Sequence, residues 1–428
     1  MSAAVEGRRY PAAAHGLRRD RVDSDALDVV RQLNDAGYEA FLVGGCVRDL
    51  LLGMHPKDFD VATSATPEEV KRVFRRCRLV GRRFRIAHVR YGRHIIEVST
   101  FRKGLVEDED ERTLAQSGLI LRDNVWGTLD EDAFRRDFTV NALYYDPEDD
   151  VIIDFVGGLD DLEHGRLRFI GDAEARLWED PVRVLRAVRF VAKLGFHLDP
   201  AIERAIPGMA EHLREIPPAR LFDEVCKLFV CGHSLAGWEY LSGTRLRWAL
   251  FPSAPPDDAL VRLAMQNTDQ RLADDKPVTP GFLLAVLMWR DYAARVDALA
   301  ATHKPAEARA RAAAETLGEQ QQIIALPRRF SQFVRDVWML QPRLEAPRPR
   351  SVGMTAGHER FRAGYDFLLL RADAGEPLRE AADWWTSYQE RDAAGQQAMI
   401  DELRAQPADA PPTKRRRRRR RRKPTPEG

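Results

Sequence analysis

The spacing of apolar residues divides this chain into two parts. Up to about residue 165, apolar residues form short runs or alternate with polar ones, as in segments 40–43, 86–91 and 95–100, and this predicts strands. Two helices are expected between them: one capped by Ser24, and one that opens on the capping box of Thr66 and Glu69. Beyond residue 165, apolar residues recur every three or four positions, which predicts helices almost throughout.

We therefore predict an α+β protein made of four parts. A mixed sheet with helices forms a head at residues 20–165, and an all-helical neck follows at 166–250. A helical body with a C-terminal extension is expected at 251–405, and a disordered, arginine-rich tail at 406–428. Within the head, the polar and acidic stretch 102–135 is expected to be a loop.

Two glycines interrupt the chain between the predicted strand 40–43 and a short helix that ends near Gly53. Gly44 and Gly45 have no Cβ, so backbone N–H groups at this turn can closely approach a phosphate. Arg48 and the positive end of the helix would face the same point. Such a glycine pair is commonly only a turn, and its neighbours decide between the two interpretations.

An acidic pair follows about 13 residues later. In the segment Asp58-Phe59-Asp60-Val61, the carboxylates alternate with apolar residues, so on a strand both carboxylates point to one face. Carboxylates so close together repel each other unless a cation lies between them, and oxygen ligands favour Mg²⁺. An isolated Asp-x-Asp is usually a solvated strand face, but the nearby glycine turn with its arginine favours the metal site.

A site for two metal ions needs a third carboxylate from a neighbouring strand. Glu97 lies between apolar residues in segment 95–100 and is a candidate, although a single charge in a strand is usually on the solvated face.

A later helix carries a row of arginines. Asp180 is a natural N-cap with Pro181 at the first helical position, and Gly195 ends the helix after about residue 194. Beside its apolar stripe, arginines recur every third residue, at Arg183, Arg186 and Arg189. Three such arginines would ordinarily form a solvated face.

The segments LVGGCVRDLLLG and KDFDVAT, within residues 42–63, resemble the nucleotidyltransferases that add nucleotides to RNA 3′ ends. This family comprises bacterial poly(A) polymerases and tRNA CCA-adding enzymes, and the resemblance covers residues 20–390. It implies that Asp58 and Asp60 bind two Mg²⁺ ions, with Glu97 or Asp137 as the third acidic residue. It also implies that Arg136 contacts the triphosphate, and that the EDxxRxxRxxRF helix, residues 179–190, binds the nucleotide through Glu179, Asp180, Arg183 and Arg186.

The same helix suggests how bases are selected. A carboxylate accepts a hydrogen bond from the exocyclic amine of adenine or cytosine, while an arginine donates one to the adjacent ring nitrogen. Asp180 with Arg183 therefore suits both bases and rejects guanine and uracil. The pair does not separate an enzyme that adds only A from one that adds C and A.

Composition adds a charge division. The net charge of +1 conceals ten consecutive basic residues, Lys414 to Lys423, and residues 1–413 carry 57 basic against 65 acidic residues, a net −8. The tail, including Arg415, Arg416, Arg417 and Arg418, is expected to bind RNA. The four cysteines lack the spacing of a metal site and the chain has no long apolar run, so a cytoplasmic protein is expected. The sequence has no heptad pattern that would favour a dimer, so a monomer is expected.

Three functions are compatible with these features. Poly(A) addition to RNA 3′ ends with ATP is favoured, because segments such as RLVGRRFRIAHVRYGRHIIEVSTFR and PPARLFDEVCKLF, like the C-terminal extension, look more like bacterial poly(A) polymerases. The alternatives are CCA addition to tRNA and, more remotely, a non-catalytic RNA-binding adaptor. Expected partners are RNA 3′ ends and ATP, with RNA-decay or RNA-chaperone proteins possible and no membrane.

Overall fold

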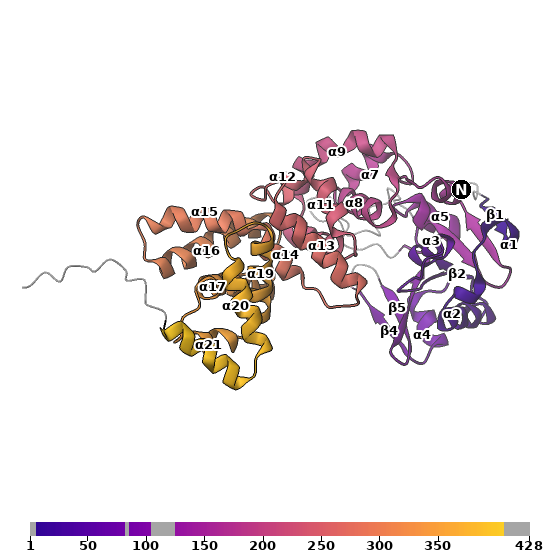
Figure 1. Ribbon diagram of the computed structural model, residues 1–428. Coiled ribbons are helices and arrows are strands. Elements are labelled where there is room, and N and C mark those ends of the chain that lie inside the picture. The colour runs from indigo at the N-terminus through magenta and orange to yellow at the C-terminus, as the bar shows by residue number, and fades with distance from the viewer. Residues whose placement is uncertain (1–5, 82–84, 104–124, 406–428) are drawn as a thin grey trace, which may run out of the picture.

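The computed structural model describes residues 6–81, 85–103 and 125–405 of the chain. Figure 1 shows a head built on one sheet and a long succession of helices that leads away from it. The α+β architecture is as predicted. The predicted tail, with its candidate residues Arg415 to Arg418, lies outside the described residues.

An eight-stranded mixed sheet organises the head. Its strand order is β1-β8-β7-β2-β3-β6-β5-β4, and of its neighbouring pairs β3 and β6 run parallel while the others run antiparallel. The strands are β1 Arg8–Pro11, β2 Ala40–Val43, β3 Asp60–Thr63, β4 Cys77–Val80, β5 Ile86–Tyr91, β6 His94–Thr100, β7 Leu143–Asp146 and β8 Val151–Asp154. No helix or strand was predicted before Ser24, yet β1 extends the sheet along β8.

Helices cover the two faces of this sheet unequally. On one face, Val61, Val89 and Val98 are buried in the main core, and α2 and α4 pack against strands β3 to β6. On the other face, Phe41 and Tyr144 form a smaller cluster with Ala133 of α5, which covers β2, β7 and β8. The helices of the head are α1 Ala12–His15, α2 Ser24–Asp35, α3 Gly45–Leu51, α4 Pro67–Val73, α5 Leu129–Phe134 and α6 Gly158–Glu163.

Local sequence signals fix several of these elements. The capping box of Thr66 and Glu69 is present at α4, as predicted. The N-cap of α2 was predicted one residue too late. The side chain of Asp23, not Ser24, accepts hydrogen bonds from the N–H groups of Asp25 and Ala26. The loop predicted at 102–135 is partly wrong: α5 forms there and buries Asp132, while residues 104–124 lie outside the described residues.

The rest of the chain is helical except for a short parallel pair, β9 Arg166–Leu167 with β10 His197–Leu198. The helices are α7 Ala173–Glu179, α8 Arg183–Leu194, α9 Pro200–His212, α10 Pro218–Phe229, α11 Ser234–Ser242, α12 Leu246–Leu250, α13 Ala259–Ala273, α14 Pro280–Leu287, α15 Trp289–Ala300, α16 Pro305–Ile323, α17 Arg328–Glu345, α18 Val352–Ala356, α19 Phe361–Asp373, α20 Arg379–Glu390 and α21 Ala393–Ala405.

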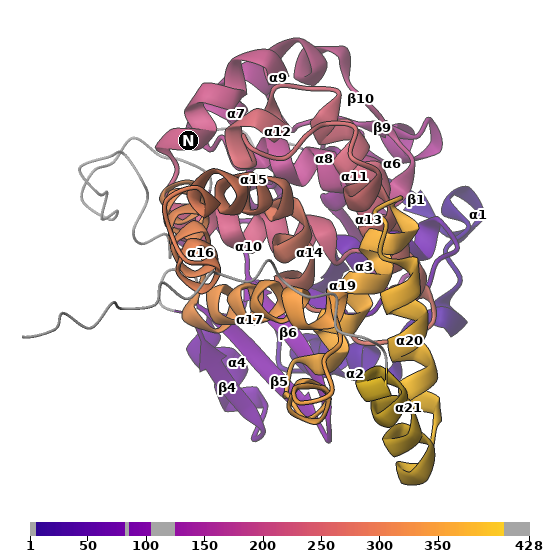
Figure 2. The same cartoon turned by 60° about the vertical axis from the view of Figure 1, so that its left-hand side comes forward.

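One hydrophobic core continues from the head through these helices as far as α19, and a second core around Trp385 joins α17, α19, α20 and α21. Figure 2 shows α17, α19 and α20 side by side in this C-terminal part. Among the described residues, no helix is both long and apolar enough to cross a membrane.

Candidate active site

The glycine turn connects β2 to α3, as the sequence predicts. Gly44 has a φ of 80°, a conformation that L side chains rarely adopt, and its N–H donates to the carbonyl of Leu143. A Cβ added to Gly44 would lie 3.5 Å from Nη1 of Arg136. Glycine is therefore required by the turn itself, and an added Cβ would be in ordinary contact with an arginine from a distant part of the chain.

Arg48 is buried beneath this turn and does not extend into solvent. Its Nε and Nη2 donate to Oδ1 of Asp49, and its Nη1 donates to Oδ1 of Asn141 at 2.5 Å. The guanidinium also lies 5.1 Å from the centre of the Phe190 ring on α8. Arg48 thus connects α3 to the segment before β7 and to the first part of the neck.

The acidic pair lies at the start of β3. Asp60 is the first residue of the strand, whereas Asp58 is exposed and precedes it, so the strand is shorter than predicted. Parallel pairing places Glu97 of β6 directly opposite Asp60. Cross-strand partners point to the same face of a sheet, so these two carboxylates share a face.

Charge crowding is visible at Asp60. Burial, followed by the negative charge of Glu97 and a smaller effect of Asp58, raises the pKa of Asp60 to about 6, against the opposing effect of Arg136. A carboxyl that is buried beside two other carboxylates is a favourable ligand for a divalent cation, because the cation removes the repulsion. The carboxylates of Asp58, Asp60 and Glu97 are therefore chemically suited to such an ion, and their oxygens do not all lie within 4.8 Å of one another in this structure.

Asp137, the other candidate for the third acidic residue, is already fully engaged. Its Oδ2 accepts from Nε and Nη2 of Arg186 on α8, at 2.8 and 2.5 Å. Its Oδ1 accepts from the N–H of Phe138 and from Asn141. Burial alone would raise the pKa of Asp137, but the charge and hydrogen bonds of Arg186 hold it below its usual value. Asp137 therefore ties the neck to the head.

Arg136 is oriented by a residue that the sequence analysis did not single out. Nε and Nη2 of Arg136 donate to Oδ2 of buried Asp132, and Tyr144 donates to the same oxygen at 2.8 Å. Burial would raise the pKa of Asp132, but the charges of Arg136 and Arg135 lower it to about 2. The spacing of four residues between Asp132 and Arg136 was a usable sequence signal, since such a pair meets within one helical turn.

The arginine helix α8 begins at Arg183 and ends at Gly195, whose φ is 68°, so its end was predicted correctly and its start is later than expected. Asp180 and Arg183 do not pair with each other. Arg183 donates to Glu179 at 2.6 Å, and Asp180 accepts from Arg220 of α10 at 2.6 Å. The sequence analysis did not identify Arg220.

Arg186 lies between Asp137 and a second carboxylate, that of Glu224 on α10. Nη1 of Arg186 is 4.0 Å from Oε1 of Glu224. Two buried polar atoms here, Nε of Arg189 and Oε2 of Glu224, have no hydrogen-bond partner. Buried polar groups are nearly always paired. The space between α8 and α10 thus has unused hydrogen-bonding capacity.

A different acidic cluster has a structural explanation. Asp23, Asp25 and His94 bring three potential ligand atoms within 4.8 Å of one another. Asp23 caps α2, and His94 is an exposed side chain that pairs with Asp25 at 3.4 Å. Capping and surface ion pairing account for this group.

Comparisons with known proteins show the family of the chain. Three family models match the chain: the "Poly A polymerase head domain" at residues 40–168, the "Probable RNA and SrmB- binding site of polymerase A" at 195–256, and the "Polymerase A arginine-rich C-terminus" at 301–423. Poly(A) polymerase I of Escherichia coli O157:H7 is 42% identical over 93% of this chain and 89% of its own length.

The CCA-adding enzyme of Lactobacillus helveticus is 39% identical, but over only 52% of this chain and 53% of its own length. Among solved structures, the CCA-adding enzyme of Bacillus stearothermophilus in complex with CTP has a TM-score of 0.56 at 26% identity, and the match covers 89% of this chain and 91% of the other. The glycine turn, the acidic row on the sheet and the arginine helix thus occur in a chain that belongs to the poly(A) polymerase family and is an enzyme of the nucleotidyltransferase class.

Proposed function

We propose that this enzyme adds adenylates to RNA 3′ ends without a template, using ATP and releasing pyrophosphate. The extent of similarity carries this proposal: relatives named poly(A) polymerase I match 93% of the chain, whereas the relatives named CCA-adding enzyme match 52%. The match to poly(A) polymerases therefore includes helices of the body, beyond the catalytic motifs that the two activities share.

Asp58, Asp60 and Glu97 would hold two Mg²⁺ ions at the open face of the sheet. The raised pKa of Asp60 supports this, because burial and the nearby charge of Glu97 both disfavour the ionised carboxylate, and a bound cation would stabilise it. Glu97 is the better third ligand, since Asp137 has both oxygens occupied by Arg186, Phe138 and Asn141. Glu97 is exposed, and its Oε1 lies 3.3 Å from Nε2 of His88. When bound, the ions would lower the pKa of the RNA 3′-hydroxyl and neutralise charge on the triphosphate.

The triphosphate would lie on the β2 side of these carboxylates. Gly44 and Gly45 allow the phosphates to approach the backbone, and Nη1 of Arg136 faces the same turn. Buried Arg48 has its three guanidinium nitrogens committed to Asp49 and Asn141, so we assign it a positioning role beneath the turn.

The base would be selected between α8 and α10. Glu179 and Asp180 lie at the end of α7, and Arg183 and Arg186 lie in the first turns of α8. Unpaired polar atoms of Arg189 on α8 and Glu224 on α10 are buried nearby. The incoming base would exchange partners with the ion pairs Arg183–Glu179 and Asp180–Arg220. The reaction needs no covalent enzyme intermediate, since the 3′-hydroxyl of the RNA can attack the α-phosphate of ATP and displace pyrophosphate directly.

CCA addition to tRNA is the second candidate. The solved structure with CTP shares the fold, and a carboxylate with an arginine accepts cytosine as well as adenine. The test is incorporation by the purified protein with Mg²⁺, offering each nucleotide separately to an unstructured RNA and to a tRNA that lacks its 3′ end.

Long tails with ATP alone on the unstructured RNA are expected. Addition that stops after C, C and A on the tRNA would favour the second candidate. No incorporation under any condition, together with intact RNA binding, would favour the non-catalytic adaptor. Asp58→Ala provides the control, because it should abolish incorporation and leave RNA binding unchanged.

We further infer a role in RNA processing and decay in the cytoplasm. Four free cysteines fit a reducing compartment. The match at residues 195–256 to a model described as binding RNA and SrmB supports interaction with RNA and with a protein partner through the neck. The basic residues Arg415 to Arg418 would add a second RNA contact, and a monomer suffices for all these roles.

A further inference from the structure

One row of cross-strand neighbours leads from the catalytic carboxylates to the edge of the sheet. Asp60 of β3 pairs with Glu97 of β6, Glu97 pairs with His88 of β5, and His88 pairs with Arg78 of β4. Neighbours in register share a face, so all four side chains project from the same side of the sheet. With about 4.8 Å between strands, Arg78 lies about 14 Å from Asp60.

This face of β6, β5 and β4 is accessible among the described residues. Alternate residues such as Ala87, Val89 and Val98 are buried against the helices on the other face. On the open face, Arg78, Arg90 and Glu97 are exposed, and so is Ile95, with 45% of its surface accessible. Figure 1 shows α4 on only one side of β4 and β5.

Arginines gather where this face reaches the edge strand. The N–H of Arg90 donates to the carbonyl of Arg76, so Arg76 lies opposite Arg90, one step along from Arg78 and His88. Arg75, Arg76, Arg78 and Arg90 line a hollow of about 380 Å³ together with Cys77 and Gly92. We call the three arginines Arg76, Arg78 and Arg90 the basic edge.

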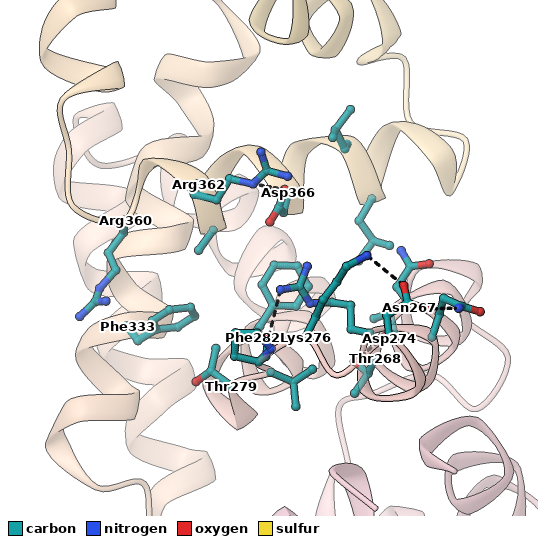
Figure 3. A pocket seen from close by; sticks show the side chains of 18 of the residues that line it. Asn267, Thr268, Asp274, Lys276, Thr279, Phe282, Phe333, Arg360, Arg362 and Asp366 are labelled. Carbon is teal, nitrogen blue, oxygen red and sulfur yellow. Dashed lines mark hydrogen bonds and ion pairs between the residues drawn. The ribbon is translucent and has the colours of Figure 1, made fainter. Parts of the chain in front are cut away.

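The charge of the basic edge is not balanced within the described part of the chain, where no carboxylate forms an ion pair with these three arginines. A hollow of about 530 Å³ in the body, shown in Figure 3, offers a contrast. There Lys276 pairs with Asp274 and Arg362 pairs with Asp366. The basic edge is thus left with positive charge available for an external anion.

The direction of the reaction indicates which anion this is. In phosphoryl transfer the attacking and leaving oxygens lie roughly in line on opposite sides of the phosphorus. If the triphosphate occupies the β2 side of Asp60, at Gly44 and Arg136, the RNA hydroxyl must approach from the opposite side. β6, β5 and β4 lie on that side of β3 in the sheet order.

We propose that the basic edge binds backbone phosphates of the RNA nucleotides immediately upstream of the reacting 3′ end. This inference rests on the proposed function for its direction along the sheet, because it assumes that ATP binds on the β2 side. The surface would guide single-stranded RNA across β4 and β5 toward Glu97 and Asp60, and exposed Ile95 would contact a base or ribose.

The test is a triple substitution of Arg76, Arg78 and Arg90 to Gln, compared with a matched double substitution of Arg8 and Arg9 to Gln. Arg8 and Arg9 are exposed on β1, the opposite edge of the same sheet. RNA affinity is measured by fluorescence anisotropy without ATP, on a short single-stranded oligonucleotide over a range of salt. The KM values for RNA and ATP are measured separately.

For the triple variant, we expect the Kd and KM for RNA to rise about tenfold or more and the salt slope to flatten by about 2, from about 0.7 per lost phosphate contact. The KM for ATP and the melting temperature should stay unchanged, and the Arg8 and Arg9 variant should resemble the wild type. Lysine at the three positions should restore most of the affinity, because it retains the charge.

An RNA affinity and salt slope equal to those of the wild type would overturn the inference, as would an equal loss in the Arg8 and Arg9 variant. Because this binding assay needs no chemistry, it also separates the two proposals. A wild-type protein that binds RNA through the basic edge but incorporates no nucleotide would refute the proposed function and leave the binding surface intact.

Discussion

Two carboxylates that the sequence could not rank, Glu97 and Asp137, differ in what surrounds them. Glu97 is exposed opposite Asp60, whereas Asp137 is partly buried against Arg186. We therefore expect Glu97→Gln to lower kcat on the order of 100-fold and to raise the Mg²⁺ concentration needed for half-maximal activity, with stability unchanged. A Mg²⁺ titration of incorporation together with urea unfolding measures both effects.

Asp137→Asn is the matched comparison. It leaves the Arg186 guanidinium without its partly buried charge partner, and loss of a hydrogen bond between charged groups destabilises by about 2 kcal/mol. The unfolding midpoint should fall while the dependence on Mg²⁺ stays as in the wild type. The reverse pattern, a changed Mg²⁺ requirement in Asp137→Asn and none in Glu97→Gln, would identify Asp137 as the third metal ligand.

The raised pKa of Asp60 predicts an unusual dependence of the protein's stability on pH. Its folded-state pKa of about 6 is above its ordinary value of 3.8, so the folded metal-free protein binds more protons than the unfolded chain between these limits. Stability from this group is therefore present at low pH and is lost as the pH rises toward 6. Asp60→Asn should raise the melting temperature of the metal-free protein at pH 7.5 but not at pH 4.

Activity should have the opposite dependence, since the metal site needs the ionised carboxylate. We expect incorporation at limiting Mg²⁺ to fall as the pH drops below about 6, and a higher Mg²⁺ concentration to shift this loss to lower pH. An Asp60→Asn variant with unchanged stability at both pH values would show that the carboxylate is not under strain in the free protein.

At the scale of elements, sequence patterns predicted what depends on neighbours along the chain. The strand, glycine turn and helix around Gly44, the capping box of Thr66 and the end of α8 at Gly195 are local, and each was found. Parallel pairing of β3 with β6 is not local, since it joins residues 37 positions apart, Asp60 and Glu97. No periodicity in either strand encodes that register, so the third carboxylate could not be chosen from the sequence.

Apart from the four-residue spacing of Asp132 and Arg136, sequence patterns did not identify the polar partners at the site. Stretch 102–135 was expected to be a loop because it is acidic, yet Asp132 is buried there because Arg135, Arg136 and Tyr144 satisfy its carboxylate. Arg220 belongs to the segment PPARLFDEVCKLF, which indicated the family but did not show which of its residues would meet Asp180. A charged side chain is buried only where other residues supply its hydrogen-bond partners, and partners from another segment are known only once the segments are packed.

The turn at Gly44 gives a prediction for one element. Gly44→Ala places a side chain at φ 80° and 3.5 Å from Nη1 of Arg136, so we expect a loss of about 1 to 3 kcal/mol of stability and a higher KM for ATP. Gly37→Ala is the matched control, because Gly37 has φ 86° with open space around it. It should lose similar stability and keep the KM for ATP, measured by urea unfolding and steady-state kinetics.

For the whole molecule, a few polar contacts fix the neck against the head. Lys193 of α8 pairs with Asp49 of α3 at 3.0 Å, and Arg186 pairs with Asp137 at 2.5 Å. Arg176 adds hydrogen bonds to the carbonyls of Arg135 and Arg136. These contacts place α8, the helix proposed to select the base, beside the glycine turn, so the two halves of the proposed nucleotide site depend on a single interface.

Charge distribution gives the last prediction, at the scale of the whole chain. Residues 1–413 carry a net charge of −8, so long RNA meets a repulsive field except at the basic edge and at the ten basic residues from Lys414 to Lys423. Truncation after Thr413 should weaken binding of long RNA and flatten its salt slope by up to about 7, from about 0.7 for each of ten contacts. Turnover on saturating RNA should remain, because the proposed catalytic carboxylates are untouched.

If the tail and the basic edge bind different parts of one RNA, their losses of affinity should add in a combined variant, and the binding of a short oligonucleotide should respond only to substitutions in the basic edge. Equal sensitivity of short and long RNA to the truncation, in anisotropy titrations over a range of salt, would instead mean that both surfaces compete for the same nucleotides.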